Sequence, residues 1–339
     1  MYTLSQLSNL LEEELQKTAL PVYPENLYQP IQYILQLPAK RLRPALTLLS
    51  CDLFKGNIND ALPVAIAIEM FHNFTLIHDD IMDNAPIRRG NDTVHQKWNN
   101  SIAILSGDAL FAVSMRQLIK CDPFIMPHIM DEYTKAALQV CEGQQLDMDY
   151  EKMHAINIAQ YIEMITLKTA VLLAASLKLG AMCAKANSND AEHIYNFGLN
   201  LGIAFQLQDD ILDVFGGDKF GKQPGGDIIA NKKTFLLIKS LELANIDQYD
   251  IIKSLIDNRN EKYTTYEKVS KMTSLYTELN VKEITEIEVN SYYQKAIACL
   301  NEINLPNDKK EVLQPHESFY DSRSRFDLGC IIMLHPWHW

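Results

Sequence analysis

The sequence predicts an all-α fold, and three observations indicate it. Glycine and proline are scarce, at 13 each among 339 residues. Long windows carry apolar residues at the i, i+3, i+4, i+7 spacing of a helix that buries one face. No stretch shows the alternating pattern of a half-buried strand. Since 47% of the residues are hydrophobic, the chain can bury a large core.

Apolar periodicity marks the expected helices in chain order. The first, over 3–18, is amphipathic and acidic, which is unlike a signal or transit peptide. Helices over 27–37 and 43–54 follow on the same apolar spacing. Residues 61–83 are apolar nearly all round, which indicates a helix buried within a bundle. The spacing then predicts helices over 101–120, 126–145, 157–185, 189–215, 232–244, 261–279 and 281–301.

The clearest breaks in the helical pattern are residues 84–95 and 216–231, and each begins directly after an aspartate cluster. Loops held by a rigid scaffold are where proteins usually bind ligands. No linker divides the helices, so we expect one domain over 1–314. Residues 315–339 are aromatic without a helical pattern, and we expect an atypical, disordered tail. Such a tail fits frame-shifted or read-through sequence, or a natural variant that contacts a partner or a membrane surface.

Charge and cysteine usage argue against several classes of protein. Subtracting 43 acidic from 31 basic residues gives a net charge of −12. This balance disfavours nucleic acid as a partner, because binding its phosphates needs a basic face. The six cysteines form no CxxC pair, so we expect reduced thiols in a cytoplasmic protein. No run of about 18 uninterrupted apolar residues occurs, so we expect no membrane span.

Two copies of the pattern Asp-Asp-x-x-Asp stand in apolar helical segments, HDDIMD and QDDILD. The aspartates are Asp79, Asp80 and Asp83 in the first copy and Asp209, Asp210 and Asp213 in the second. Crowded carboxylates repel one another, so we expect a bound cation to stabilise them. Oxygen ligands with open positions suit Mg²⁺ bound to a substrate phosphate. Solvated helix ends are the simpler alternative, and the matched pair of clusters argues against it.

Basic residues stand near both clusters, as a diphosphate ligand requires. They are Arg88 and Arg89 after the first cluster, Lys222, Lys232 and Lys233 after the second, and Lys40, Arg41 and Arg43 in the segment AKRLRP. Lys168 is the most informative, because a lysine inside the apolar segment EMITLKTAVLLAAS is costly unless it has a partner. For Arg41 and Lys233 we expect solvated surface positions.

In combination, KRLRP, HDDIMD…RRG, an intrahelical KT and FQLQDDILD resemble the motifs of the trans-isoprenyl diphosphate synthases, or polyprenyl synthetases. The resemblance runs from about residue 27 to about 305. It implies a helical bundle of the isoprenoid-synthase type around a deep central cavity, usually in a homodimer. The implied reaction is ionisation of an allylic diphosphate and attack by the double bond of isopentenyl diphosphate. An apolar cavity that excludes water would protect the carbocation.

The same resemblance implies roles for individual residues. The six aspartates would hold about three Mg²⁺ ions, which together with Lys168 stabilise the departing diphosphate. The other contacts of the allylic diphosphate would be Arg88, Lys168, Thr169, Gln206, Lys222 and Lys232. The isopentenyl diphosphate site would comprise Lys40, Arg43, His72 and Arg89.

Chain length in this family depends on how deep the cavity runs below the first cluster. The resemblance assigns the limiting position to Phe74, whereas a helical wheel places Thr75 and Phe71 directly beneath Asp79. Ordinary core packing of Phe71 and Phe74 is the alternative. Aromatic residues here favour a short product of C15 to C20, of the farnesyl or geranylgeranyl type.

Two departures from the family pattern stand out besides the tail. Pro38-Ala39 replaces the usual Gly-Gly, which puts in doubt a close backbone approach to a phosphate, and the loop GKQPGGD is about one residue longer than usual. The alternatives are a synthase of C30 or longer products, a class I terpene cyclase, a metal phosphohydrolase, a non-catalytic partner subunit and a purely structural helical protein, which would have no reason to keep two matched carboxylate clusters. The second Asp-Asp-x-x-Asp argues against a cyclase, and missing histidine ligands argue against a phosphohydrolase.

Overall fold

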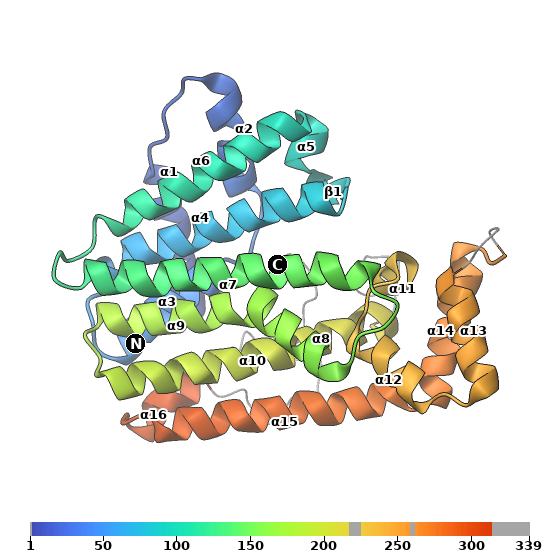
Figure 1. Cartoon of the computed structure of the whole chain (residues 1–339). Helices are drawn as coiled ribbons and strands as arrows, with labels where there is room; N and C mark the ends of the chain where they lie inside the picture. The colour runs from blue at the N-terminus through green and yellow to red at the C-terminus, as the bar shows by residue number, and fades with distance from the viewer. Residues whose placement is uncertain (1, 217–224, 258–261, 314–339) are drawn as a thin grey trace.

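The structure is a computed structural model that describes residues 2–216, 225–257 and 262–313, and these residues are almost entirely helical (Figure 1). The only strands among them are β1 (Ile87–Arg88) and β2 (Asn91–Asp92), which pair as a small antiparallel hairpin. The predicted all-α fold is therefore confirmed. The tail at 315–339 lies outside the described residues.

The first half of the chain contains seven helices: α1 (Leu4–Lys17), α2 (Glu25–Gln36), α3 (Leu42–Leu53), α4 (Ile58–Met82), α5 (Val94–Lys97), α6 (Asn100–Leu118) and α7 (Met126–Lys152). The second half continues with α8 (Ile158–Ile165), the π-helical turn η1 (Thr166–Ala170), α9 (Val171–Cys183), α10 (Ser188–Phe215), α11 (Gly226–Ala230), α12 (Phe235–Leu243), α13 (Ile246–Asp257), α14 (Thr265–Glu278), α15 (Val281–Glu302), α16 (Asn307–Lys310) and the 3₁₀ turn η4 (Glu311–Leu313).

The long helices lie side by side, and α4, α7 and α10 all run toward the same end of the bundle (Figure 1). α3 packs between α4 and α9, and α10 packs between α9 and α15. The two aspartate clusters stand near the carboxyl ends of α4 and α10. The parallel course of these helices therefore brings both clusters to one end of the bundle, next to α11 and the α13–α14 pair.

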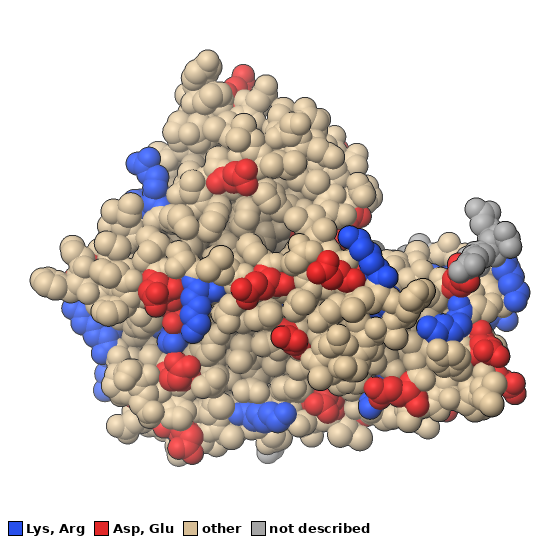
Figure 2. All heavy atoms as spheres, in the orientation of Figure 1, with Lys and Arg blue, Asp and Glu red and all other residues tan. Residues whose placement is uncertain are grey.

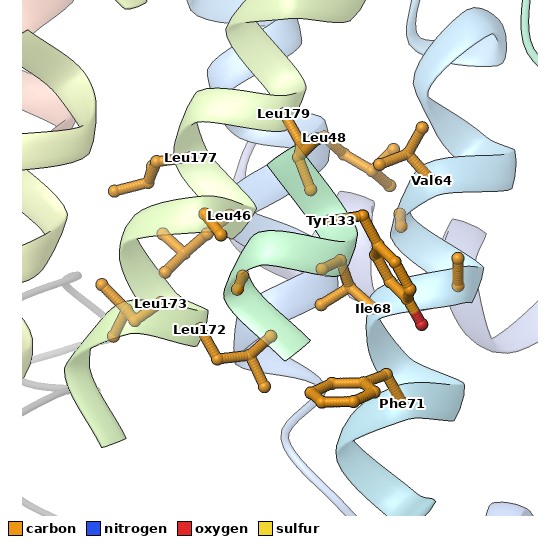
Figure 3. Close-up of a cluster of buried hydrophobic side chains, with 14 of the residues drawn as sticks. Leu46, Leu48, Val64, Ile68, Phe71, Tyr133, Leu172, Leu173, Leu177 and Leu179 are labelled. Atoms are coloured by element: carbon orange, nitrogen blue, oxygen red, sulfur yellow. The ribbon is translucent and has the colours of Figure 1, made fainter. Parts of the chain in front are cut away.

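Close packing of apolar side chains between α3, α4, α7 and α9 forms the main core (Figure 3). Phe71 and Tyr133 are among its largest members, each 1% exposed. Truncating one such side chain to alanine costs about 3–5 kcal/mol of folding free energy. This core holds α4 and α7 as rigid supports for the site.

Among the described helices of eight or more residues, one is missing from the sequence expectation. The helix α13 buries only Ile252 and Leu255, so its apolar stripe is too thin to stand out from sequence. The expected helix over 157–185 is also interrupted, because η1 inserts a π-helical turn between α8 and α9. Both stretches expected as loops hold short elements, β1 and β2 in the first and α11 in the second.

Two stretches, Ile58–Met82 and Ile158–Cys183, are long and apolar enough to cross a membrane by length and composition. In each, 72% of the most apolar window is buried within the fold. Other helices therefore account for their apolar surface.

Candidate active site

A cavity of about 610 Å³ opens at the end of the bundle where the two aspartate clusters meet. Its walls come from α3, α4, β1, α7, α8, η1, α9, α10 and the segment from α11 to the start of α12. Five of the six predicted aspartates line it: Asp79, Asp83, Asp209, Asp210 and Asp213.

The face of the molecule in Figure 2 carries scattered acidic and basic side chains rather than a continuous basic band among its described residues.

Asp80 is the exception among the aspartates. It is 1% exposed and does not line the cavity. The guanidinium of Arg88 donates to its Oδ1 from Nη2 at 2.6 Å and from Nε at 3.0 Å. Burial raises the pKa of Asp80, and Arg88 opposes that shift. In this arrangement Arg88 holds the second aspartate of the cluster and reaches within 3.7 Å of Asp79.

Asp210 is the most enclosed member of the second cluster. The hydroxyl of Tyr161 donates to Asp210 Oδ2 at 2.5 Å, and the backbone N–H of Phe235 donates to the same oxygen at 3.2 Å. Burial raises the pKa of Asp210 well above its usual value, and nearby Asp227 adds to the shift. A cation beside this carboxylate would favour its charged form, so the site fits a metal ion.

Lys168 has carboxylate partners, as expected for a lysine in an apolar helical segment. Its Nζ lies 2.5 Å from Asp147 Oδ2 and 3.5 Å from Asp79 Oδ1. Burial acts to lower the pKa of Lys168, but the two carboxylates outweigh it and the pKa is raised. The residue sits in η1, and π-helical turns of this kind are frequent at functional sites.

The close approach of α7 to η1 depends on Gly143. A Cβ atom at this position would lie 2.1 Å from the backbone nitrogen of Lys168. Thr169, the next residue of the turn, donates to Gln206 Oε1 on α10 at 3.2 Å. Lys168, Thr169 and Gln206 all line the cavity.

Lys232 also lines the cavity, from the segment after α11. Burial acts to lower its pKa, but Asp227, Asp83 and other carboxylates outweigh burial and raise it. The cavity therefore combines carboxylates with two charged lysines, as a metal diphosphate requires. The last predicted contact of this group, Lys222, lies outside the described residues.

A second basic group, Arg43, His72 and Arg89, lies next to this cavity. Arg43 Nη1 is 3.4 Å from His72 Nε2, and both residues line the cavity. Burial lowers the pKa of Arg43 to about 10 and that of Arg89 to about 10. Nε and Nη1 of Arg89 are buried and have no hydrogen-bond partner among the described residues. Orphaned buried donors beside two other basic groups fit an anion. Lys40 is exposed on the segment before α3 and does not line the cavity.

The expected surface position of Arg41 is wrong. Arg41 is 4% exposed, and its Nη1 lies 2.5 Å from Glu69 Oε1, while Nε lies 3.4 Å from Glu12 on α1. A buried guanidinium needs such a partner to offset lost hydration. Lys233 is half-buried, so its expected solvated position is only partly correct.

Phe74 and Thr75 line the cavity, whereas Phe71 does not. The ring of Phe74 stacks on Phe111 of α6 with centroids 5.1 Å apart. Phe71 lies behind it, 5.7 Å from Tyr133 of α7. The helical wheel misplaced Phe71 because it ignores the neighbouring helices that cover that side of α4.

Four residues of the site were not predicted from the sequence: Asp147, Asp227, Tyr161 and Glu69. Glu69 carried a usable signal, because a lone carboxylate in the apolar stretch AIAIEMF needs a partner as much as Lys168 does. Asp147 and Asp227 stand in polar segments where aspartate is unremarkable. Tyr161 resembles any other buried aromatic residue of an amphipathic helix.

The donor set suits Mg²⁺ that arrives with a phosphate. No three His, Cys, Asp or Glu side chains among the described residues converge tightly enough to hold one ion by themselves. Mg²⁺ typically takes one or two carboxylates and completes its shell with water and substrate phosphate. Carboxylates around a cavity with lysines opposite match that requirement.

The fold and the site define a helical enzyme that handles diphosphates, and sequence comparison gives its family. A family model described as polyprenyl synthetase matches residues 24–273, and the chain belongs to this family. It is therefore a prenyltransferase that acts on isoprenyl diphosphates. This membership favours the synthase over the cyclase and phosphohydrolase alternatives.

Individual relatives agree with the family assignment. The geranylgeranyl diphosphate synthase of Sulfolobus acidocaldarius is 38% identical over 290 residues, which cover 83% of this chain and 86% of the relative. The geranylfarnesyl diphosphate synthase of Natronomonas pharaonis is 36% identical over 239 residues, or 65% and 70% of the two chains. A crystal structure of a geranylgeranyl pyrophosphate synthase matches with a TM-score of 0.90 at 38% identity and covers 99% of each chain.

Proposed function

We propose that the chain condenses an allylic diphosphate with isopentenyl diphosphate, head to tail and in the trans configuration, to a C15–C20 diphosphate of the farnesyl or geranylgeranyl type. The observation that carries the proposal is the meeting of two carboxylate clusters with Lys168 and Lys232 around one cavity. Arg43, His72 and Arg89 supply a separate basic group for the second diphosphate.

Each group then has a task. The carboxylates that line the cavity would hold about three Mg²⁺ ions, which stabilise negative charge on the leaving diphosphate. Lys168, Lys232 and Arg88 bind the allylic diphosphate and orient its C–O bond. The orphaned donors of Arg89, with Arg43 and His72, hold isopentenyl diphosphate so that its double bond faces the cation. Apolar walls that include Met164, Ile165 and Leu172 exclude water from the reacting carbons.

The proposed product length depends on Phe74. Its ring stands in the cavity wall about one helical turn before Asp79, backed by Phe111, and would block a growing chain. The relatives include synthases named for C20 and C25 products. A C30 or longer product is the second candidate.

A homodimer and a cytoplasmic location complete the proposal. Ile104 and Leu105 of α6 and Leu138 of α7 are exposed apolar side chains on neighbouring helices, which suits contact with a second copy. The five described cysteines are free thiols, which fits a reducing compartment. Light scattering at micromolar concentration tests the dimer directly.

A product assay tests the reaction. The protein is incubated with Mg²⁺, labelled isopentenyl diphosphate and, separately, C5, C10 and C15 allylic diphosphates, and the dephosphorylated alcohols are sized. We expect one C15 or C20 product that EDTA abolishes. Products of C30 or longer would retain the reaction and refute the aromatic block. No product from any starter would favour the partner-dependent subunit.

A further inference from the structure

Lys268 is a buried lysine outside the cavity that the proposed reaction does not use. It lies on α14, is 6% exposed, and pairs with no carboxylate among the described residues. Its Nζ donates to the backbone oxygen of Ile229 at 3.1 Å and to Asn231 Oδ1 at 2.7 Å. Both acceptors belong to the end of α11. Its acceptors among the described residues are neutral, and a largely buried ammonium without a countercharge is costly, which indicates a specific task.

The helix α11 cannot hold its position alone. It has five residues, and isolated helices of this length are unstable in water. Lys268 satisfies its carboxyl end, where carbonyl groups lack partners and a cation is favourable. Asn231, which ends α11, has a left-handed backbone with φ of 57°. Its side chain also donates to Ile256 O of α13 at 3.2 Å.

The amino end of α11 is attached to the second aspartate cluster. The backbone N–H of Asp227 donates to Asp213 Oδ2 at 3.0 Å, and the N–H of Gly225 donates to the backbone oxygen of Asp213 at 2.8 Å. Gly225 has φ of 84°, and a Cβ there would lie 2.7 Å from Val269 of α14. The helix α11 is therefore fixed at one end by hydrogen bonds to Asp213 of α10 and packs against α14.

The position of α11 also determines the position of Lys232. The N–H of Lys232 donates to the backbone oxygen of Asp227 at 2.9 Å, and Lys232 follows Asn231 directly. Asp213, Asp227 and Lys232 all line the cavity. Any shift of α11 would therefore move Asp227 and Lys232 together and disturb the hydrogen bond that Asp213 accepts from Asp227. Arg43 and His72 stand on α3 and α4 and do not depend on α11.

We propose that Lys268 is a positioning residue for the allylic diphosphate and its metal ions, acting through its hydrogen bonds to the carboxyl end of α11. The inference rests on the proposed function. It extends the site to α14, a helix that contributes no cavity-lining side chain among the described residues.

The test replaces Lys268 with methionine, which keeps the length of the side chain and removes both hydrogen bonds. In steady-state assays, we expect the KM for geranyl diphosphate and the Mg²⁺ concentration for half activity to rise by about tenfold, as for other groups that orient metal ligands. The KM for isopentenyl diphosphate should stay at the wild-type value. Lys268→Arg, which retains a cationic donor, should recover most of the loss.

Matched variants separate positioning from general damage. Lys271→Met makes the same change at an exposed position of α14 and should behave as wild type. Asn231→Gly removes the side-chain acceptor while tolerating the left-handed backbone. It should raise the same two parameters, and the double variant with Lys268→Met should be less than additive. If Lys268→Met does not fold, Asn231→Gly decides alone.

Clear outcomes overturn the proposal. An unchanged KM for geranyl diphosphate in folded Lys268→Met, or an equal rise in the KM of both substrates, would refute it. Calorimetric titration with geranyl diphosphate and Mg²⁺, in the absence of isopentenyl diphosphate, measures the same effect without turnover. If the wild-type protein binds the allylic diphosphate but forms no product, the proposed reaction is refuted. The binding affinities of the Lys268 variants would still test the positioning role of Lys268.

Discussion

Neutralising Glu69 should destabilise the fold around three buried arginines, Arg41, Arg43 and Arg89. Glu69 is 1% exposed, pairs with Arg41, and accepts a hydrogen bond from Asn73 Nδ2 at 2.7 Å. Its charge also acts favourably on the buried guanidinium groups of Arg43 and Arg89. The variant Glu69→Gln keeps the shape and removes the charge that three buried arginines share.

The structure sets the expected size of the effect. Removing one partner of a buried ion pair costs about 3–5 kcal/mol of unfolding free energy. The lower end applies here, because Glu12 lies 3.4 Å from Arg41 Nε and is partly exposed. A loss of about 3 kcal/mol is large against a total of about 5–15 kcal/mol. It corresponds to a fall in melting temperature of roughly 4–5 °C, because the unfolding entropy of a domain of about 310 residues is about 0.65 kcal/mol/K.

The assay is urea denaturation followed by helical circular dichroism, with a melting curve on the same samples. Glu192→Gln is the matched control, since Glu192 pairs with Lys178 at 2.8 Å on the surface and should lose less than about 1 kcal/mol. The double variant Arg41→Met/Glu69→Met should recover only the part of the loss that comes from the Arg41 pair, because Arg43 and Arg89 still lack the charge of Glu69. If Glu69→Gln loses less than about 1 kcal/mol of unfolding free energy, Glu69 is not the countercharge that the three buried arginines share.

Three further predictions concern the cavity and its neighbours. Burial and nearby arginines lower the pKa of His72 well below its usual value, so the folded protein keeps it neutral while the unfolded chain takes up a proton. Stability should therefore fall as the pH drops below about 6.5, and less so in His72→Asn. Phe74→Ala should lengthen the product by at least one C5 unit in the sizing assay. Tyr161→Phe should lower kcat/KM by about tenfold and raise the Mg²⁺ requirement, because Asp210 loses a donor at 2.5 Å.

Each of these has an outcome that contradicts it. Equal pH dependence in His72→Asn and wild type would show that His72 does not titrate on unfolding. Phe71→Ala should destabilise the core by about 3–5 kcal/mol and leave the product length unchanged. A longer product from Phe71→Ala, with none from Phe74→Ala, would reverse the roles of the two rings. Wild-type kinetics in Tyr161→Phe would assign that hydrogen bond to folding alone.

Patterns within one segment were enough to predict the helices and both aspartate clusters. Apolar spacing reports which face of a helix is buried, and it placed α4 and α10 correctly. It failed for α13, because two buried residues leave too thin a stripe. Lys168 could be singled out because an unpaired lysine in an apolar helix is costly wherever that helix packs.

The sequence by itself determined the helical composition, the two carboxylate clusters and the resemblance to polyprenyl synthetases. Only the tertiary structure decided that Asp147 pairs with Lys168, that Glu69 holds Arg41, and that Phe74 rather than Phe71 faces the cavity. These facts depend on which helices pack together and at what rotation. Periodicity within one helix carries no information about its neighbours, so residues far apart in sequence meet only once the bundle has formed.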